Sequence, residues 1–252
     1  MRGLNGKRVV LTGGASGIGR ATALRLAQEG CVLAIFDLNE KGAKETADQC
    51  PDQAGVRAFQ VDITDAAQVS AASGTFEAQF GPTEGQADIA GWDQPKRFLD
   101  TDRAFWDKVI QINLYGQLIM HHVVVRGMAD RRSGRVVNVA SDAGRVGSSG
   151  EAVYSACKGG IIAFTKTLAR ELAGRGVTLN ALSPGPTDTP LFDAFRQAPG
   201  GDKIGDALAR AIPLRRLGTP EDYPGLIAFL LSDDASYITG QTISVSGGLT
   251  ML

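Results

Sequence analysis

The sequence has few cysteines and histidines, and this scarcity excludes several classes of protein. Its three cysteines, Cys31, Cys50 and Cys157, are odd in number, lie far apart among 252 residues and form no Cys-x-x-Cys pair. A disulfide framework and a zinc site are therefore not expected. The two histidines, His121 and His122, are adjacent, so on a helix they point to different faces and do not predict a metal site.

Long apolar runs, a basic stripe and an acidic tail are also missing. No apolar run approaches the roughly 20 residues that span a bilayer, and the first residues lead directly into a strand-like segment rather than a signal peptide. The 26 lysines and arginines nearly balance the 27 aspartates and glutamates, and both signs are mixed along the chain. We therefore expect a cytoplasmic protein that binds neither membranes nor nucleic acids.

Apolar residues and glycines, by contrast, are abundant. Hydrophobic residues make up 43% of the chain, enough for one large core, so we expect a single domain over residues 1–252. Near-continuous apolar strands alternate with helical patterns, which predicts a doubly wound parallel α/β sheet (Rossmann-like) with helices on both faces. The strands are expected at 8–12, 31–36, 56–61, 135–140, 177–182 and 242–245, and the helices at 18–28, 41–50, 66–80, 117–128, 153–172 and 220–231.

A further buried strand is expected between residues 81 and 91, but the composition there is unsuitable. The β-propensity is poor, and polar residues fall at positions that should be buried. A buried Asp88 would need a partner or a raised pKa. Two explanations remain open: a local sequence error across residues 83–89, which resequencing of the gene would reveal, or a genuinely altered or loosened strand.

A glycine-rich turn, containing Gly13, Gly17 and Gly19, joins the first expected strand to the first expected helix. A tight turn needs positive φ, and glycine lets the backbone approach a pyrophosphate. The helix N-terminus offers free N–H groups and partial positive charge to that anion. Such a turn alone is weak evidence, but the strand–turn–helix context predicts a dinucleotide site.

Two aspartates follow the second and third expected strands. Asp37 can accept hydrogen bonds from both ribose hydroxyls of an adenosine and would repel a 2′-phosphate. No lysine or arginine lies within the glycine turn, although Arg20 follows it, so NAD is favoured over NADP. Asp62 can bond the adenine amino group. The alternative for each aspartate is a helix cap, Asp37 serving the helix that begins near Asn39.

Tyr154 and Lys158 lie four residues apart and share one face of the expected long helix. A nearby ammonium favours the phenolate and lowers the pKa of a tyrosine, as acid–base catalysis on an alcohol or carbonyl requires. Such a pair is common on helix surfaces. Ser141, at the end of a buried strand where open α/β sheets bind ligands, makes the catalytic interpretation stronger, although a turn-forming serine is the alternative.

Over essentially its whole length the chain resembles the short-chain dehydrogenase/reductases. The glycine turn, Asp62, Ser141, Tyr154 and Lys158 have that family's order and spacing, as do Asn113, Pro184-Gly185, Thr189-Pro190 and Ser246-Gly247-Gly248. The family's Asn-Asn-Ala-Gly, however, is replaced here by Asp88-Ile89-Ala90-Gly91. This departure puts cofactor affinity and stability in doubt more than the type of reaction.

The resemblance implies a role for each matching residue. Tyr154 would exchange the proton, Lys158 would lower its pKa and hold the nicotinamide ribose, Ser141 would polarise the substrate oxygen, and Asn113 would support a proton-relay water. Thr187 would contact the carboxamide through its backbone and Thr189 through its hydroxyl. The full expected NAD-binding set is Gly13, Ser16, Gly17, Ile18, Gly19, Asp37, Asp62, Ile63, Ala90, Gly91, Tyr154, Lys158, Pro184, Gly185, Thr187 and Thr189.

The implied enzyme transfers a hydride between NAD(H) and a secondary alcohol or ketone. Residues 140–151 and 244–251 are similar to those of 2-hydroxycyclohexanecarboxyl-CoA dehydrogenases, which suggests a cyclic or β-hydroxyacyl-CoA thioester as the substrate. The alternatives are a 3-oxoacyl-thioester reductase, a general secondary-alcohol dehydrogenase and, more remotely, a non-catalytic NAD sensor. The resemblance also implies a homotetramer that uses the helix at 117–128 and the Tyr154 helix.

Several details of the substrate pocket are left open by the sequence. Residues 188–213 are rich in glycine, alanine and charge, as suits a mobile lid. Trp92 and Arg145 either line the pocket or serve ordinary packing. Cys157, beside Lys158, is interpreted as a small packing residue rather than a nucleophile.

Overall fold

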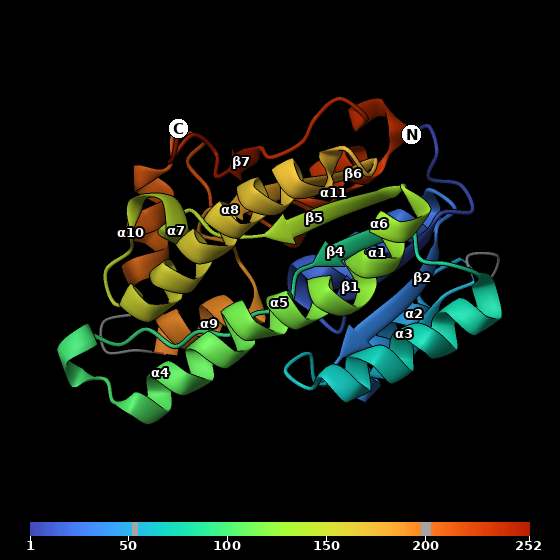
Figure 1. Cartoon of the computed structure of the whole chain (residues 1–252). Helices are drawn as coiled ribbons and strands as arrows, with labels where there is room; N and C mark the ends of the chain where they lie inside the picture. The colour runs from blue at the N-terminus through green and yellow to red at the C-terminus, as the bar shows by residue number, and fades with distance from the viewer. Residues whose placement is uncertain (52–54, 198–202) are drawn as a thin grey trace.

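A seven-stranded parallel sheet forms the centre of the protein (Figure 1). The structure is a computed structural model and describes residues 1–51, 55–197 and 203–252. The strand order is β3-β2-β1-β4-β5-β6-β7, so the direction of chain progression reverses between β1 and β4. The strands are β1 (Arg8–Thr12), β2 (Val32–Asp37), β3 (Arg57–Gln60), β4 (Gly85–Asp88), β5 (Gly134–Val139), β6 (Val177–Pro184) and β7 (Thr242–Val245).

Helices follow most of the strands and return the chain to the end of the sheet at which the parallel strands begin. The α-helices are α1 (Gly17–Gln28), α2 (Glu40–Asp48), α3 (Ala66–Phe80), α4 (Arg103–Ile110), α5 (Gly116–Met120), α6 (Arg126–Arg131), α7 (Ala143–Val146), α8 (Ala152–Ala173), α9 (Pro190–Gln197), α10 (Ile204–Ala211) and α11 (Pro224–Leu231). The π-helical segments are η3 (Gln111–Tyr115) and η4 (His121–Val125), and the short 3₁₀ helices are η2 (Phe98–Asp100), η6 (Pro220–Asp222) and η7 (Asp233–Ala235).

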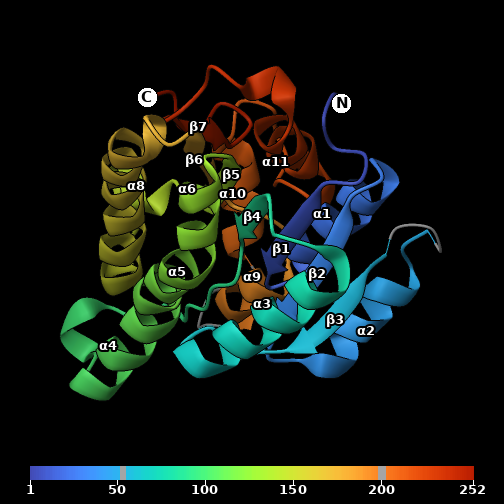
Figure 2. The same ribbon diagram turned by 45° about the vertical axis from the view of Figure 1, so that its right-hand side comes forward.

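The alternation of side chains along each strand creates two apolar layers. In β1, Val9 and Leu11 pack with α1, α2 and α11, while Val10 packs with α3, α6 and η4 on the opposite face. Figure 2 shows α1, α2 and α11 on one side of the sheet and α3, α5, α6 and α8 on the other. Burial on both faces is the reason why the strands are almost continuously apolar in sequence.

The predicted fold class is confirmed, and the structure refines several boundaries. The strands expected at 8–12 and 242–245 and the helix expected at 66–80 have the same bounds as β1, β7 and α3. The expected helix at 117–128 belongs to a longer helical run, residues 103–131, that contains both π-helical segments. Pro224 interrupts the expected helix at 220–231 and separates η6 from α11, because proline cannot donate a helical hydrogen bond.

The questioned fourth strand is formed and fully paired. β4 lies between β1 and β5 with Gly85 to Asp88 in parallel register with both neighbours, so the strand is not loosened. The Thr12 hydroxyl accepts hydrogen bonds from the backbone N–H groups of Ile89 (3.0 Å) and Ala90 (3.2 Å). It thereby ties the end of β4 to β1.

The polar residues of β4 are buried as the sequence indicated, and Asp88 has both a partner and a shifted pKa. Gln86 donates a hydrogen bond from Nε2 to Asp88 Oδ2 (2.5 Å), and His121 Nδ1 lies 3.4 Å from the same oxygen. That His121 nitrogen also lies 2.7 Å from the carbonyl oxygen of Gln117, so it is shared. Burial outweighs these contacts and raises the pKa of Asp88.

Substituting Asp88→Asn should stabilise the protein at neutral pH. The amide removes a buried charge, keeps an acceptor for Gln86 and adds a donor beside Asn138, the β5 register neighbour whose Oδ1 is buried without a partner. We expect a gain of about 1–2 kcal/mol, which raises Tm by roughly 2–8 °C. Thermal unfolding at pH 7.5 would measure the change.

The pH dependence of this gain provides its control. A carboxyl whose folded-state pKa is raised costs stability as pH rises above its unfolded value, near 3.9. The advantage of the Asp88→Asn variant should therefore shrink toward pH 4. Asp100→Asn removes an exposed carboxylate and should leave Tm within about 1 °C. A lower Tm for the Asp88 variant at pH 7.5 would show that the carboxylate is a net stabilising group.

Within the described residues, no helix combines the length and the apolar character needed to cross a bilayer.

Candidate active site

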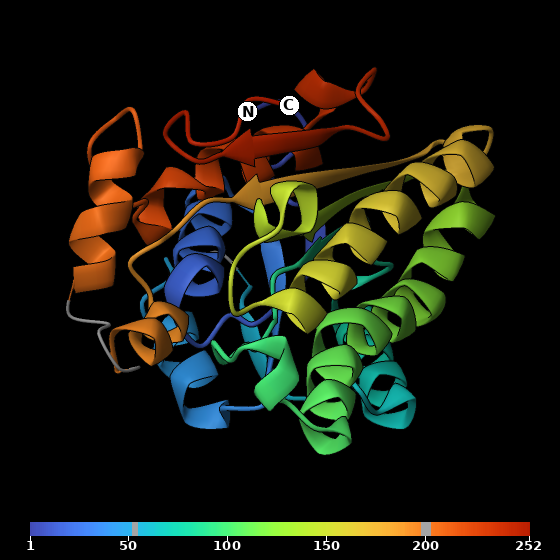
Figure 3. The same ribbon diagram turned by 90° about the vertical axis from the view of Figure 1, so that its left-hand side faces the viewer.

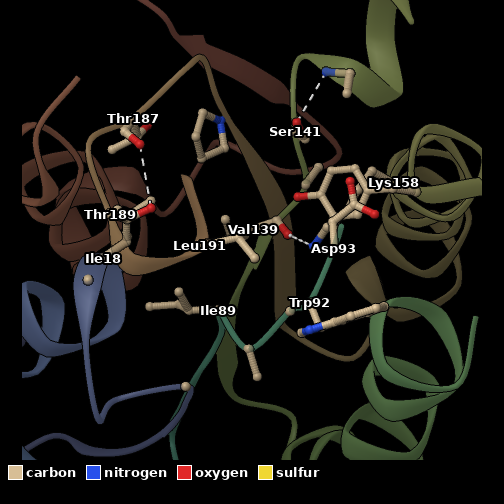
Figure 4. A pocket seen from close by; sticks show the side chains of 18 of the residues that line it. Ile18, Ile89, Trp92, Asp93, Val139, Ser141, Lys158, Thr187, Thr189 and Leu191 are labelled. Atoms are coloured by element: carbon tan, nitrogen blue, oxygen red, sulfur yellow. Dashed lines mark hydrogen bonds between the residues drawn. The ribbon is translucent and has the colours of Figure 1, made fainter. Parts of the chain in front are cut away.

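One large cavity opens at the carboxyl ends of the central strands, where the strand order reverses (Figure 4). Its volume is about 1120 Å³, enough for a dinucleotide and a small substrate. Open α/β sheets bind ligands at this position. The cavity brings together all the residues expected for catalysis and cofactor binding except Asn113, namely Gly13, Ser16, Gly17, Ile18, Gly19, Asp37, Asp62, Ile63, Ala90, Gly91, Ser141, Tyr154, Lys158, Pro184, Gly185, Thr187 and Thr189.

The glycine turn forms a close-fitting cradle at the start of α1. Gly13 has a φ of +75°, and a Cβ added to it would lie 2.8 Å from Cα of Ala90. A Cβ at Gly19 would overlap the carbonyl oxygen of Gly13. Ser16, the N-cap of the 12-residue helix α1, makes no capping hydrogen bond with its side chain. The free N–H groups of this helix end and the Ser16 hydroxyl therefore fit a pyrophosphate.

Asp37 is fixed at the edge of the same cavity. Its Oδ2 accepts a hydrogen bond from the Ala15 N–H (2.9 Å), and its Oδ1 accepts one from the Asn39 N–H (2.8 Å). The alternative role as a helix cap is wrong, because Asn39 caps α2 by accepting from the Gly42 N–H (3.1 Å). Asp37 thus lies beside the glycine turn with its carboxylate oriented by backbone donors.

Asp62 is likewise not the cap of the following helix. Asp65 caps α3, while Asp62 Oδ1 accepts bonds from the backbone N–H (2.9 Å) and the hydroxyl (2.7 Å) of Thr64. Asp62 lines the cavity together with Ile63, whose side chain packs against Gly116.

The segment after β6 lies opposite the glycine turn. A Cβ added to Gly17 would lie 3.4 Å from Cγ2 of Thr189, which brings the two segments into contact. The Thr187 hydroxyl bonds the carbonyl of Gly185 (2.8 Å) and the hydroxyl of Tyr223, so only its backbone is free for a ligand. The Thr189 hydroxyl makes one long bond, 3.4 Å, to the Thr187 carbonyl.

Ser141, Tyr154 and Lys158 meet at the inner end of the cavity. Ser141 follows β5, and its Oγ accepts a hydrogen bond from the Ala143 N–H (3.1 Å). Tyr154 and Lys158 lie on α8, with the Lys158 Nζ 5.5 Å from the centroid of the Tyr154 ring. The Lys158 ammonium donates to the carbonyl of Val139 (2.9 Å), as Figure 4 shows.

Burial controls the protonation of this pair. It raises the pKa of the Tyr154 phenol, and the carboxylates of Glu151 and Asp93 raise it further, whereas a hydrogen bond with Ser141 lowers it. Burial also lowers the pKa of Lys158 to about 8. The expectation that Lys158 lowers the pKa of Tyr154 is therefore not met, because Lys158 is not among the groups that shift it. Desolvation is the largest effect on the Tyr154 phenol, because the phenol is buried.

Asn113 lies just behind the cavity rather than in its lining. Its Nδ2 donates to the carbonyls of Trp92 (2.6 Å) and Val109 (2.9 Å), and its Oδ1 accepts from the Trp92 N–H (3.1 Å). A Cβ added to Gly91 would lie 3.0 Å from this Oδ1 and 3.6 Å from Lys158 Nζ. Asn113 therefore positions the loop after β4 and faces Lys158 across Gly91.

Two acidic residues of the cavity were not singled out from the sequence. Asp93 follows β4, and Glu151 is the N-cap of α8, three residues before Tyr154. Burial raises the pKa of both carboxyls, that of Asp93 to about 7. In the sequence they resemble ordinary acidic residues of a loop and of a helix N-terminus. Only the spacing of Glu151 from Tyr154 indicates that an acidic residue lies at the site.

Trp92, Arg145 and Cys157 differ in their relation to the substrate pocket. Trp92 lines the cavity, where the Lys108 ammonium lies 3.7 Å from its ring centroid. Arg145 does not line it and instead bonds Ser244 Oγ (2.9 Å) and the Leu252 carbonyl. Cys157 is buried, and burial raises the pKa of its thiol, as suits a packing residue.

The expected lid contains α9 and α10, and part of the predicted range, residues 198–202, lies outside the described residues. Figure 3 shows both helices beyond the carboxyl end of β6. They contribute four apolar side chains to the cavity wall, Leu191, Phe192, Phe195 and Leu208.

Comparison with known proteins agrees with this geometry. The family model described as Enoyl-(Acyl carrier protein) reductase matches residues 13–250. The 3-oxoacyl-[acyl-carrier-protein] reductase FabG of Staphylococcus aureus is 38% identical over 97% of this chain and 98% of its own. The human (3R)-3-hydroxyacyl-CoA dehydrogenase is 35% identical over 96% of this chain and 95% of its own.

Solved structures show the same relationship. Levodione reductase superposes with a TM-score of 0.92 at 32% identity, covering 97% of each chain. The 3-ketoacyl-(acyl-carrier-protein) reductase of Brucella melitensis, solved in complex with NADH, gives 0.91 at 29% identity and covers 98% of this chain and 100% of its own.

The fold and the cavity define a nicotinamide-dependent oxidoreductase that acts on CH–OH groups. More specifically, the chain belongs to the short-chain dehydrogenase/reductase family, which confirms the family and the reaction class predicted from its motifs.

Substituting Tyr154→Phe should abolish turnover while leaving cofactor binding intact. The change removes one hydroxyl from the cavity and preserves the ring. We expect kcat to fall about 10²–10⁴-fold, the range for loss of a general acid–base group. Steady-state absorbance of NADH and a fluorescence titration with NADH would measure the two properties. Tyr115→Phe, at a half-exposed tyrosine outside the cavity, is the matched control. Retention of activity by the Tyr154 variant would remove this residue from the mechanism.

Proposed function

We propose that the protein is an NAD(H)-dependent dehydrogenase or reductase of a secondary alcohol or ketone. One observation carries the proposal: Ser141, Tyr154 and Lys158 line the same cavity as the glycine turn and Asp37. The cofactor, when bound, supplies the hydride acceptor or donor. A proton-transfer group and a dinucleotide cradle within one enclosed space are the two requirements of this chemistry.

The preference for NAD over NADP is supported by the surroundings of Asp37. Its carboxylate lines the cavity beside the glycine turn, where it would bind the adenosine ribose and repel a 2′-phosphate. Arg20, the cation nearest in sequence to the turn, is not among the residues that line the cavity. It bonds the Ala15 carbonyl (2.6 Å) and the Thr46 hydroxyl (3.0 Å) and lies 3.6 Å from Glu45.

The residues of the protein bind the substrate oxygen and transfer its proton. The Ser141 hydroxyl is available to hold the substrate oxygen beside Tyr154. In the direction of reduction, the Tyr154 phenol gives its proton to that oxygen, and its raised pKa keeps this proton in place at neutral pH. In the direction of oxidation, Tyr154 takes the proton from the alcohol, so oxidation gains from higher pH. Lys158 supports the phenolate and holds the nicotinamide ribose.

The substrate class is narrowed by the cavity wall and by the relatives. Phe192 and Phe195 stack with centroids 5.5 Å apart in the part of the wall that α9 forms, which suits an apolar or cyclic substrate body. The relatives that are named for thioesters support a β-hydroxyacyl or 3-oxoacyl thioester, on CoA or on a carrier protein. A general secondary-alcohol dehydrogenase is the second candidate, supported by the similarity to levodione reductase.

We also propose that the protein is a cytoplasmic homotetramer of single-domain subunits. The long helical run at 103–131 and α8 lie side by side on one face of the molecule (Figure 3), and Tyr115 is half exposed there. Such a face could contact a second copy.

A steady-state screen tests the proposed function and its remote alternative, a non-catalytic NAD sensor. Secondary alcohols, ketones and β-hydroxyacyl thioesters would be assayed with NAD(H) and NADP(H) in parallel. We expect turnover with a higher kcat/KM for NAD. Cofactor binding without turnover of any substrate would favour the sensor, and a higher kcat/KM for NADP would contradict the proposed role of Asp37.

Substituting Asp37→Ser should reduce this cofactor preference. The serine removes the negative charge and the paired acceptors, so we expect the ratio of kcat/KM for NAD to that for NADP to fall about 10- to 100-fold, equivalent to one or two charge-assisted hydrogen bonds. Asp48→Ser, an exposed carboxylate at the end of α2, is the matched control and should keep the ratio of the unmodified enzyme.

A further inference from the structure

A pair of acidic side chains, Asp93 and Glu151, forms one wall of the cavity beside Tyr154. The two residues come from different parts of the chain, the loop after β4 and the N-terminus of α8. A hydrogen bond from the Lys96 N–H to the Gly150 carbonyl (2.9 Å) holds these segments together. The backbone of the protein therefore holds the two acidic residues together in the cavity wall.

Asp93 lines the cavity, and its carboxyl is incompletely satisfied. The residue is only 4% exposed, and its Oδ2 is buried without a hydrogen-bond partner. Figure 4 shows it among the cavity-lining side chains, near Lys158. The Lys158 ammonium donates to Val139 and forms no hydrogen bond with this oxygen.

The two carboxyls also interact with each other. Burial raises the pKa of both carboxyls, and the nearby Glu151 carboxylate raises that of Asp93 further. The pair therefore resists carrying two negative charges within the cavity wall. Both groups lie close enough to Tyr154 to act electrostatically on its phenol.

We propose that Asp93 and Glu151 are specificity-determining residues that bind a hydrogen-bond-donating group, a hydroxyl or an ammonium, next to the reacting carbon of the substrate. This inference rests on the proposed function and, of its two candidate substrate classes, selects secondary alcohols or ketones with a neighbouring donor, because the carbon next to the reacting carbon of a β-hydroxyacyl thioester is an apolar CH2 group. An apolar group at this position leaves a buried acceptor unpaired, and a carboxylate meets a like charge. Selection of this kind is strong, because the penalty falls on the protein group as well as on the ligand.

Four alcohols with one ring skeleton would test the proposal. Cyclohexanol has no neighbouring group, whereas cyclohexane-1,2-diol presents a hydroxyl, 2-aminocyclohexanol an ammonium and 2-hydroxycyclohexanecarboxylate an anion. The diol and the amino alcohol would be supplied as separate cis and trans isomers. The measured quantity is kcat/KM for each alcohol relative to cyclohexanol, at saturating NAD.

We expect at least one donor-bearing isomer to exceed cyclohexanol by about 10- to 100-fold, the value of one hydrogen bond to a charged group, and the anion to fall below it. The better of the diol and the amino alcohol identifies which donor the pair prefers. In Asp93→Ala this ratio should fall toward one, and Glu151→Gln should lower it as well. Asp100→Asn, an exposed carboxylate in the same loop region, should retain the ratio of the unmodified enzyme.

The outcomes separate this inference from the proposed function. Turnover of the alcohols without preference for a donor, or a preference that both variants retain, would overturn the role of the pair alone. Loss of the preference in Glu151→Gln would still support the pair if Asp93→Ala failed to fold, which circular dichroism and NADH fluorescence would reveal. No turnover of any alcohol or of the thioester screen would overturn both the proposed function and this inference.

Discussion

The close approach of β1 and β4 at their carboxyl ends is the contact on which the rest of the site depends. Gly13 lies against the backbone of Ala90, so close that no side chain fits between them. At the same point the Thr12 hydroxyl binds the first two N–H groups after β4. The chain must leave these two strands in opposite directions, and the space between the departing segments is the cavity.

Strand β4 affects both the stability of the core and the position of the cavity. β4 carries Gln86 and Asp88 into the core, where a charge is expensive unless it is paired. The strand still forms, because its backbone is paired on both sides and Gln86 supplies a donor to Asp88. The unusual composition therefore affects the protonation of a core carboxyl and does not prevent the strand from pairing with both neighbours.

Electrostatics inside the cavity are dominated by the removal of water. Burial raises the pKa of Tyr154 and lowers that of Lys158, so each tends toward its neutral form. Asp93 and Glu151 act in the same direction on the tyrosine. The proposed catalytic phenol, with two carboxyls beside it, is consistent with reduction at neutral pH and with a substrate that has its own hydrogen-bond donor.

The fold class and the position of the motif residues could be predicted from the sequence, because both depend on patterns among residues that are close together in the chain. Apolar strands between helical patterns required a sheet covered on both faces, and glycines between β1 and α1 required a tight turn. For the same reason, Ser141 could be placed at the end of a strand, and Tyr154 and Lys158 on one face of a helix. The caps of α2 and α3 could not be assigned, since several nearby side chains, such as Asp37 and Asn39, compete for the same N–H groups.

Only the tertiary structure decided the features that join distant segments. The pairing of Asp93 with Glu151, the orientation of Lys158 toward Val139 and the bond from Arg145 to Leu252 each connect residues with no shared sequence pattern. The pKa of Tyr154 belongs to this group as well: residue spacing reveals the lysine four positions away, but the cost of burial depends on everything packed around the phenol.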